Sequence, residues 1–193
     1  KILINKVLKK YKVKKNNFFL ISFHREENLL KKNNLNNFFL IINYLSDEFN
    51  LPILISTHPR TKKYIISKNI KKKSKIFFLE PFSYKDYISL QLTAKVTISD
   101  SGSLTEEASI LNFKSICLRD NFERQEGYSS SSILISQPNL KSFKKILDFE
   151  LKSVKKINKS FQEYNKEDFS EHLARIVVSK IDYINKYTWH KNT

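Results

Sequence analysis

Residues suited to binding a phosphate and a sugar hydroxyl lie together in the segment DSGSLTEE of this 193-residue chain. Gly102, one of only two glycines, stands between Ser101 and Ser103 and is followed by Glu106 and Glu107. A glycine lets a ligand approach the backbone and tolerates an unusual φ. Ser103 and Glu106 match the Ser-x-x-Glu capping box, which predicts a helix with Ser103 as its N-cap. The unpaired N–H groups and the positive end of such a helix form a cradle for an anion.

The second carboxylate, Glu107, needs its own explanation because Glu106 already completes the cap. It lies about 100° further round the helix, where a carboxylate can accept two hydroxyl hydrogen bonds, as a ribose diol offers. Arg119 ends the next apolar run and is expected to face phosphate or to balance Glu107 and Asp120. The alternative is an ordinary strand–turn–helix junction, in which acidic residues favour the helix start.

Six short apolar runs are predicted strands, and helical patterns separate several of them. The runs are apolar nearly throughout, as is typical of strands covered on both faces. They span residues 18–23, 52–57, 75–80, 95–99, 115–119 and 131–136. Helical spacing of apolar residues predicts helices over 35–49, 104–111 and about 170–186. This alternation predicts a parallel sheet with helices on both faces.

The loops after five successive predicted strands are unusually polar. They read HREEN, HPRTKK, EPFSYKDY, DSGSLTEE and RDNFERQEG. Right-handed crossovers bring all of these loops to one edge of the sheet, and ligands bind outside the carboxyl ends of the strands. Histidines, arginines and both glycines therefore converge there, which predicts a site for an anion.

The composition is basic, with 35 Lys and Arg against 19 Asp and Glu, a net charge of +16. Such an excess is compatible with a nucleic acid or a membrane surface as partner. The lysines are scattered without an aromatic–basic stacking module, so we interpret them as solvated surface. No run approaches about 18 apolar residues, and the basic start lacks the features of a secretory signal. The single cysteine, Cys117, is expected to be buried, and we expect a cytoplasmic protein without a metal or a cofactor.

Four motifs recur in order and together resemble the non-hydrolysing UDP-N-acetylglucosamine 2-epimerase family: SFHREEN, STHPR, DSGSLTEEASIL and LRDNFERQEG. The resemblance covers most of the chain but only the carboxyl-terminal half of a typical member. YKDYISLQ and the ending RIVVSKIDYINKYTWHK are similar to the branch that makes UDP-N-acetyl-L-fucosamine and related sugars. That branch implies a role in surface polysaccharide synthesis, such as O-antigen or capsule.

The resemblance implies a Rossmann-like doubly wound sheet, the nucleotide-binding half of a glycosyltransferase-B-like two-domain fold. We expect residues 1–16 to lead in from an amino-terminal domain that this sequence lacks. Residues 17–168 are expected to form the UDP-binding domain, and 169–193 a helix and tail that cross towards the missing domain. The resemblance also implies a homodimer that binds a UDP-sugar, with no nucleic-acid or membrane partner.

Site residues carry over from the resemblance position by position. The implied UDP contacts are His24 at the diphosphate, Phe82 and Tyr87 beside the uracil, Ser101, Gly102 and Ser103 around the phosphates, Glu107 on the ribose hydroxyls, and Arg119 as a further nucleotide-binding arginine. His24 and Arg25 are the implied catalytic residues. The implied supporting or sugar-side residues are His58, Arg60, Glu123, Arg124 and Glu126. Phe82 replaces a polar contact, Ser103 a usual second glycine, and Gln125 a usual proline. For His58, a loop histidine that merely hydrogen-bonds backbone is an equal alternative.

The family's reaction inverts C2 of the sugar by eliminating UDP to a glycal and adding UDP back after reprotonation on the opposite face. Hydrogen-bond donors that are held in place before the reaction stabilise the negative charge on the departing diphosphate. We assign this role to residues 101–103, Arg119 and His24. The acid and base at C2 are expected chiefly from the missing domain, so this chain alone should bind UDP but epimerise a UDP-sugar poorly or not at all. The alternatives are a UDP-sugar glycosyltransferase, a non-catalytic UDP-sugar-binding module and a basic nucleic-acid binder.

Overall fold

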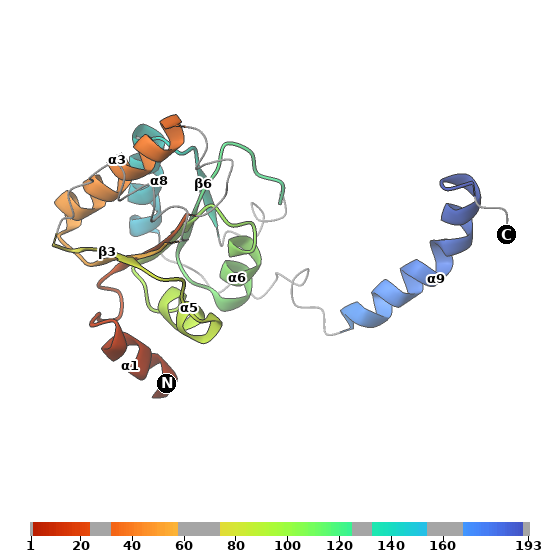
Figure 1. Cartoon of the computed structure of the whole chain (residues 1–193), viewed down its shortest axis with the longest axis horizontal. Coiled ribbons are helices and arrows are strands. Elements are labelled where there is room, and N and C mark those ends of the chain that lie inside the picture. The colour runs from red at the N-terminus through yellow and green to blue at the C-terminus, as the bar shows by residue number, and fades with distance from the viewer. Residues whose placement is uncertain (1, 24–31, 58–73, 125–132, 154–167, 191–193) are drawn as a thin grey trace. The chain divides into compact units, whose positions relative to one another are not determined.

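The computed structural model describes residues 2–23, 32–57, 74–124, 133–153 and 168–190. The chain divides into two compact units, Lys1–Asn158 and Lys159–Thr193. The first contains a six-stranded sheet with helices on both faces (Figure 1). Its strands are β1 (Phe19–Ser22), β2 (Ile53–Ser56), β3 (Ile76–Leu79), β4 (Val96–Ser99), β5 (Ser115–Leu118) and β6 (Leu134–Ser136). Its described helices are α1 (Ile2–Lys10), α3 (Lys32–Phe49), α5 (Tyr84–Gln91), α6 (Leu104–Leu111) and α8 (Leu140–Lys152).

The strand order is β3-β2-β1-β4-β5-β6, and every pairing is parallel. This order belongs to the doubly wound Rossmann-type sheet, in which the winding direction reverses between β1 and β4. The predicted fold class is therefore confirmed, and each observed strand lies inside its predicted run. The strands are short and largely buried, which explains why they appear in the sequence as continuous apolar runs.

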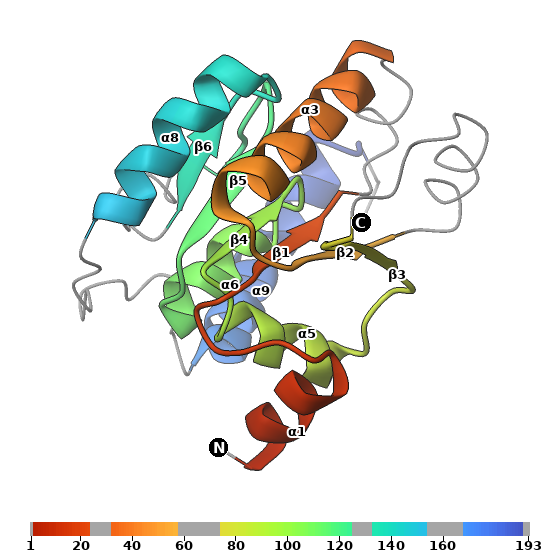
Figure 2. The same ribbon diagram turned by 90° about the vertical axis from the view of Figure 1, so that its left-hand side faces the viewer.

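The core is divided by the sheet into layers, because successive residues of a strand point to opposite faces. Phe19 and Ile21 of β1 pack with residues of α3 and α8, whereas Leu20 packs with residues of α1 and α5. Figure 2 shows α3 and α8 on one side of the sheet and α1, α5 and α6 on the other. A third cluster lies under α6 and includes Cys117, which is buried as predicted.

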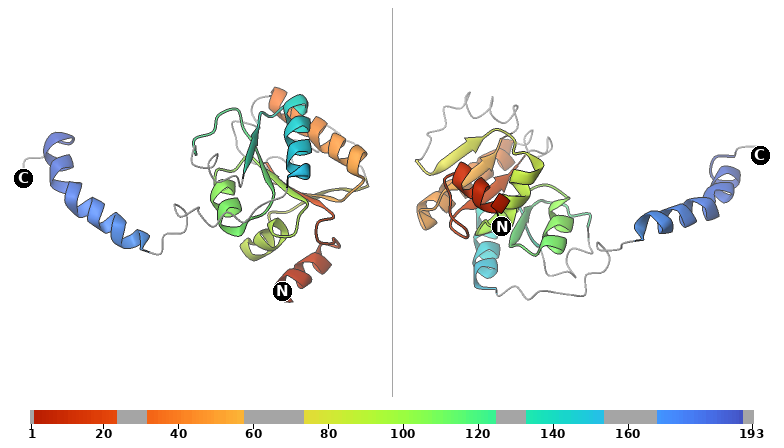
Figure 3. Two further views of the ribbon diagram at one scale, coloured as in Figure 1. Left: turned by 180° about the vertical axis from the view of Figure 1, so that it is seen from behind. Right: turned by 90° about the horizontal axis from the view of Figure 1, so that it is seen from below.

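Helices α3 and α8 lie side by side over one face of the sheet (Figure 3). The apolar stripe predicted for α3 is confirmed: its members are buried or packed partly against the core. Buried members are Leu35, Phe38, Ile42 and Leu45, and partly buried ones are Phe39 and Phe49. On the opposite face, α6 buries Leu104 and Ala108 of its predicted stripe.

Helix α1 is fixed to α5 through the carboxylate of Asp86. Lys10 Nζ lies 2.6 Å from Asp86 Oδ2, and the Tyr11 hydroxyl donates to the same oxygen at 3.0 Å. These donors, Lys10 first and then Tyr11, hold the pKa of Asp86 below its usual value although burial opposes them. Val7 of α1 also joins the core under the sheet. The segment that includes α1 thus packs within the sheet unit.

The second unit contains α9 (Phe169–Tyr187), which confirms the helix predicted over about 170–186. None of its residues is buried, and its apolar stripe is exposed along its length. The stripe consists of Leu173, Ile176, Val177, Ile181 and Ile184. Among the described residues of both units, no helix is long and apolar enough to span a bilayer.

Candidate functional site at the carboxyl edge of the sheet

The carboxyl ends of β1 and β4 meet where the winding of the sheet reverses. Ser22 and Ser99, the last residues of these strands, are register partners, and the N–H of Asp100 donates to the carbonyl of Ser22 at 3.3 Å. Residues 101–103 follow β4 directly and lead into α6. Ligands of doubly wound sheets bind in the crevice at this reversal point. The predicted phosphate-binding segment therefore occupies the expected position in the fold.

The start of α6 differs from the predicted capping box. Ser103 has helical backbone angles, φ −61° and ψ −16°, and its side chain makes no capping hydrogen bond. An N-cap is ordinarily extended, so a helical Ser103 does not direct its hydroxyl to the N–H groups of the first turn. The Ser103 hydroxyl instead donates to Glu107 Oε1 at 3.3 Å and lies 3.0 Å from the Ser101 hydroxyl. The N–H of Ser101 is also engaged, because it donates to Ser99 Oγ at 3.0 Å. Ser103 therefore occupies the predicted N-cap position before α6, but the side-chain hydrogen bonds of the capping box do not form among the described residues.

Gly102 is required by its neighbour Arg124. Its φ is not positive, so no unusual backbone conformation calls for glycine. A Cβ built at Gly102 would overlap Nη1 of Arg124 and lie 2.9 Å from its Cζ. Arg124 is held in this place by Glu106, whose Oε1 accepts from Arg124 Nε at 2.5 Å. The guanidinium thus packs directly on the start of α6.

This contact gives Arg124 a larger part in the candidate site, relative to Arg119, than the sequence predicts. The sequence assigned Arg124 only a supporting or sugar-side role, yet the structure brings it onto the predicted phosphate-binding segment, against Gly102. The available signal was Glu106, a carboxylate four residues after Gly102 that needs a cationic partner when it does not complete a capping box. Among the described residues, Glu106 pairs with an arginine and Glu107 does not.

Glu107 is held by two neutral donors. Gln91, the last residue of α5, donates its Nε2 to Glu107 Oε2 at 2.5 Å, and Ser103 donates to Oε1. Each carboxylate oxygen has about two lone-pair directions, so each retains one for a further donor. Glu107 is partly exposed, so a hydroxyl of a ligand can reach it. This geometry suits a vicinal diol.

The predicted base-binding residues form an aromatic wall beside this carboxylate. The rings of Phe82 and Tyr87 lie nearly parallel, with centroids 6.2 Å apart and planes at 16°, and Tyr11 packs edge-on to Phe82 at 5.2 Å. Burial, followed by the negative charge of Glu107, raises the pKa of Tyr87 to about 12. Hydrogen bonds with Ser22, Ser99 and Gln91 lower it only in part. Tyr87 therefore remains protonated at neutral pH and links α5 to the reversal point of the sheet.

Arg119 lies just beyond β5 and is buried, with 6% of its surface exposed. Its Nη2 donates to Glu123 Oε1 at 3.1 Å, so its charge partner is Glu123 rather than Glu107 or Asp120. Its Nη1 meets no acceptor within the described part of the chain. A buried donor without an acceptor is costly, and an anion is the natural partner of a guanidinium. Arg119 thus keeps one buried donor for a further acceptor.

Several predicted site residues lie outside the described residues: His24, Arg25, His58, Arg60 and Glu126. The residues that the structure describes and brings to the carboxyl edge are Tyr87, Ser101, Gly102, Ser103, Glu107 and Arg124. Phe82 joins them through its contact with Tyr87. Within the described ranges, no three His, Cys, Asp or Glu residues gather as a metal site.

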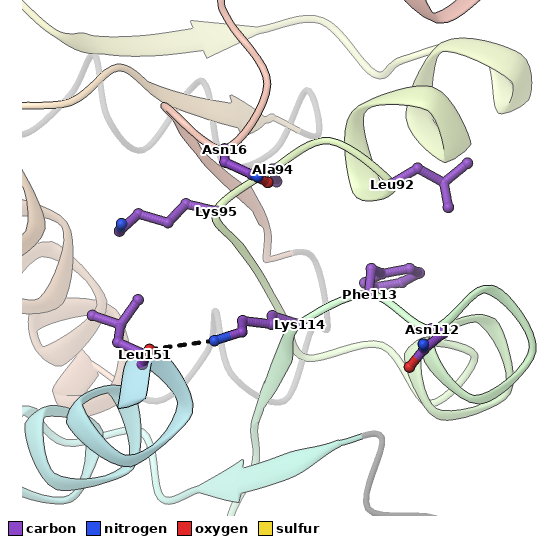
Figure 4. Close-up of a pocket in the computed structure, with 8 residues that line it drawn as sticks. All are labelled: Asn16, Leu92, Ala94, Lys95, Asn112, Phe113, Lys114 and Leu151. Atoms are coloured by element: carbon purple, nitrogen blue, oxygen red, sulfur yellow. Dashed lines mark hydrogen bonds between the residues drawn. The ribbon is translucent and has the colours of Figure 1, made fainter. Parts of the chain in front are cut away.

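A separate hollow of about 350 Å³ lies at the opposite edge of the sheet, beside Lys95 and Lys114 (Figure 4). These residues immediately precede β4 and β5, so the hollow faces the amino ends of the strands. The ammonium group of Lys114 donates to the carbonyls of Glu150 and Ser153 at 2.7 and 2.9 Å and therefore caps the end of α8. Lys114 has a structural role, and the hollow is not part of the candidate site.

Comparison with known proteins identifies the family. The family model for UDP-N-acetylglucosamine 2-epimerase matches residues 2–178. The chain belongs to this family. A UDP-N-acetylglucosamine 2-epimerase of Methanococcus maripaludis is 31% identical over 159 residues, which cover 80% of this chain and 43% of that protein. An epimerase of the same name from Methanocaldococcus jannaschii is 38% identical over 113 residues, which cover 56% of this chain and 31% of that protein.

Solved epimerase structures share the fold. The UDP-N-acetylglucosamine 2-epimerase of Rickettsia bellii superposes with a TM-score of 0.80 at 35% identity, covering 97% of this chain and 52% of that one. The Methanocaldococcus jannaschii enzyme, solved in complex with UDP-GlcNAc and UDP, gives a TM-score of 0.75 at 29% identity, covering 90% and 48%. This chain thus spans about half the length of these epimerases and corresponds to one part of their glycosyltransferase-B-like fold.

Proposed function

We propose that this chain is the UDP-binding half of a non-hydrolysing UDP-N-acetylhexosamine 2-epimerase, an isomerase. Membership of the epimerase family supports the reaction class. The observation that carries the assignment to UDP is the arrangement at the start of α6, where Arg124 packs on Gly102 and Glu107 offers two free acceptor directions one turn later. Guanidinium and carboxylate side by side match the diphosphate and the diol of one nucleotide.

In this proposal the diphosphate lies against residues 101–103, where the Arg124 guanidinium donates to its oxygens. Arg119 Nη1 and His24 supply further donors. Glu107 accepts from both ribose hydroxyls. The uracil lies against the aromatic wall of Phe82 and Tyr87. The order uracil, ribose, diphosphate then runs from α5 to the start of α6, which places the sugar beyond the phosphates.

The reaction proposed for the complete enzyme begins with loss of UDP. The C2 proton leaves to a base as the bond between C1 and the phosphate oxygen breaks, which forms a glycal with a C1–C2 double bond and free UDP. Return of a proton to the opposite face of C2, with attack of the same phosphate oxygen at C1, gives the inverted sugar. Negative charge grows on the diphosphate in the first step, and fixed cationic donors such as Arg124 stabilise it there. His24 and Arg25 act at the sugar side of the diphosphate, and the base and acid at C2 come from the other half.

The finer proposal is that the product is UDP-N-acetyl-L-fucosamine or a related sugar nucleotide for surface polysaccharide, made in the cytoplasm by a homodimer. The motifs YKDYISLQ and RIVVSKIDYINKYTWHK support this branch. We also propose that the exposed apolar stripe of α9 packs against the amino-terminal half that the relatives possess. A helix with a continuous apolar face needs such a partner in water.

Isothermal titration calorimetry of the chain with UDP, UMP and UDP-GlcNAc tests the assignment. UDP should bind more tightly than UMP, because the second phosphate adds contacts at the start of α6. Glu107→Ala should weaken UDP binding by about tenfold or more, the effect of losing hydrogen bonds to a charged acceptor. Glu171→Ala, which removes an exposed carboxylate from α9, is the matched control and should leave the affinity unchanged.

Three outcomes would contradict the proposal or a part of it. Equal affinities of the native chain and Glu107→Ala for UDP would show that Glu107 does not contact the ribose. Binding of single-stranded RNA that falls steeply with salt and ignores Glu107→Ala would favour the nucleic-acid alternative instead. Turnover of UDP-GlcNAc by the purified chain alone would contradict the assignment of the C2 acid and base to the other half.

A further inference from the structure

Gln91 is a completely buried amide that the mechanism above does not use. It ends α5, has no exposed surface, and donates Nε2 to Glu107 Oε2 at 2.5 Å. Its own Oε1 is buried and meets no donor in the part of the chain that the structure describes. An unpaired buried acceptor costs free energy, so each such group in a folded protein needs an explanation. An apolar side chain of the same length would fill this place without that cost.

The explanation lies in the contrast between the two neighbouring carboxylates. Glu106 pairs with the cation Arg124, whereas both oxygens of Glu107 receive neutral donors, from Gln91 on one side and Ser103 on the other. A neutral donor fixes the carboxylate without cancelling its charge. Two donors from different elements also prevent rotation of the carboxylate plane, so the remaining lone pairs keep a fixed direction. Glu107 therefore stays a strong and oriented acceptor.

We propose that Gln91 is a positioning residue that gives this site its preference for ribonucleotides over deoxyribonucleotides, by orienting Glu107 toward both hydroxyls of the ribose. The inference rests on the proposed function, since it requires a ribose at Glu107. A carboxylate held in one plane accepts from the 2′- and 3′-hydroxyls together. A carboxylate that rotates freely follows whichever hydroxyl is present and discriminates poorly.

The test compares UDP with 2′-deoxy-UDP, by calorimetry, on the native chain and on Gln91→Met. Methionine has nearly the volume of glutamine and removes both the donor and the unpaired acceptor. The native chain should bind UDP about tenfold or more tightly than 2′-deoxy-UDP, the ratio expected for one hydrogen bond to a charged group. In Gln91→Met this ratio should fall to about threefold or less, while the melting temperature stays equal or rises. A residue with a purely structural role would change the melting temperature and leave the ratio intact.

The possible failures separate the two proposals. If the native chain prefers UDP to 2′-deoxy-UDP about tenfold and Gln91→Met keeps that preference, the proposed role of Gln91 is wrong, but the proposed contact of Glu107 with the ribose stands. If the native chain binds both nucleotides equally well, the ribose contact itself is wrong and the role of Gln91 falls with it.

A second variant covers the case in which Gln91→Met does not fold. In Gln91→Glu the introduced carboxyl lies against Glu107, and the two then share one proton at low pH and repel at high pH. The protonated carboxyl replaces the lost donor, so the preference for UDP should be close to native near pH 5 and should decline towards pH 8. The native chain, measured across the same range, supplies the control. A preference that does not change with pH in Gln91→Glu would overturn the proposal.

Discussion

Gly102→Ala is the substitution whose consequence the structure defines most closely. The added methyl group would overlap Arg124 Nη1 and lie 2.9 Å from Cζ, closer than such atoms approach without moving. The guanidinium of Arg124 must therefore shift away from the start of α6, which we expect to disrupt its contact with Glu106. Because Arg124 is our proposed diphosphate donor, the substitution should remove one charge-assisted hydrogen bond to the ligand. Such a bond contributes about 1.5–3 kcal/mol, which corresponds to a loss of roughly tenfold to a hundredfold in UDP affinity.

The same substitution should change the stability of the fold very little. The φ of Gly102 is not positive, so alanine is not strained there and gains about 0.4–1 kcal/mol by restricting the unfolded chain. The Arg124–Glu106 pair has about a third of each side chain exposed, and its loss costs about 0–1 kcal/mol. These two effects largely offset each other. Urea unfolding should therefore give a free energy of unfolding within about 1 kcal/mol of the native chain.

A double-mutant cycle distinguishes this explanation from direct contact between Gly102 and the ligand. Arg124→Ala alone should weaken UDP binding about as much as Gly102→Ala, and the double variant should be no weaker than Arg124→Ala, because no guanidinium remains to displace. Arg175→Ala, which breaks an exposed Arg–Glu pair in α9, is the control and should have no effect on UDP. If Gly102→Ala costs the same affinity with and without Arg124, the methyl group clashes with the ligand itself and our account of Gly102 is refuted.

Two further predictions concern stability. The pKa of Asp86 is lowered by Lys10 and Tyr11, so its stabilising effect should be complete above the ordinary aspartate pKa of about 3.9 and should disappear as the pH falls through the lower folded value. Melting temperatures of the native chain and Asp86→Asn should thus differ at pH 7 and converge in acid; a constant difference would contradict this. Asn112, at the end of α6, has left-handed angles, φ 54° and ψ 52°. In urea unfolding, Asn112→Ala should therefore lower the free energy of unfolding by about 1 kcal/mol, and Asn112→Gly should lower it little or not at all. Equal losses in the two variants would be inconsistent with a left-handed helix end.

The fold was predictable because its strands are buried on both faces. Runs such as residues 18–23 and 115–119 contain almost no polar residues, and in a parallel sheet that pattern specifies strand and environment together. Loop positions at one edge then follow from the handedness of the crossovers. The short helix α5 lacks a clear apolar stripe in the sequence, because polar Asp86, Ser89 and Gln91 are among its buried residues. Asp86 and Gln91 bind Lys10 of α1 and Glu107, contacts that no local pattern encodes, whereas Ser89 donates to the carbonyl of Lys85 in the same helix.

The site was predictable only in part, for the same reason. The segment at 101–103 and its place after β4 follow from local sequence, as does the carboxylate at 107. The capping-box hydrogen bonds do not form because Glu106 pairs with a tertiary partner, Arg124, and Ser103 has helical backbone angles. The unusual φ expected at Gly102 is absent, and the structure adds a reason for glycine that local sequence does not show: a side chain there would overlap Arg124, which lies 22 positions later in the chain, the difference between 124 and 102. Long-range pairs of this kind become visible only in coordinates.

The proposed division of work in this half of the active site has a physical basis. Glu107, oriented by Gln91, holds the ribose equally in the substrate, in the separated UDP and in the product, because the ribose does not change during the reaction. Such uniform binding cannot accelerate the elimination step, but it keeps the departed UDP in place until it adds back. The donors on the diphosphate behave differently, because the charge they face grows as the bond to C1 breaks, and their stabilisation grows with it. In a complete enzyme, weakening the ribose contact should therefore release UDP before re-addition and leave the glycal unreacted, whereas weakening Arg124 should slow the elimination itself. The neutral partners of Glu107 and the charged partner of Glu106 are suited to these two separate tasks.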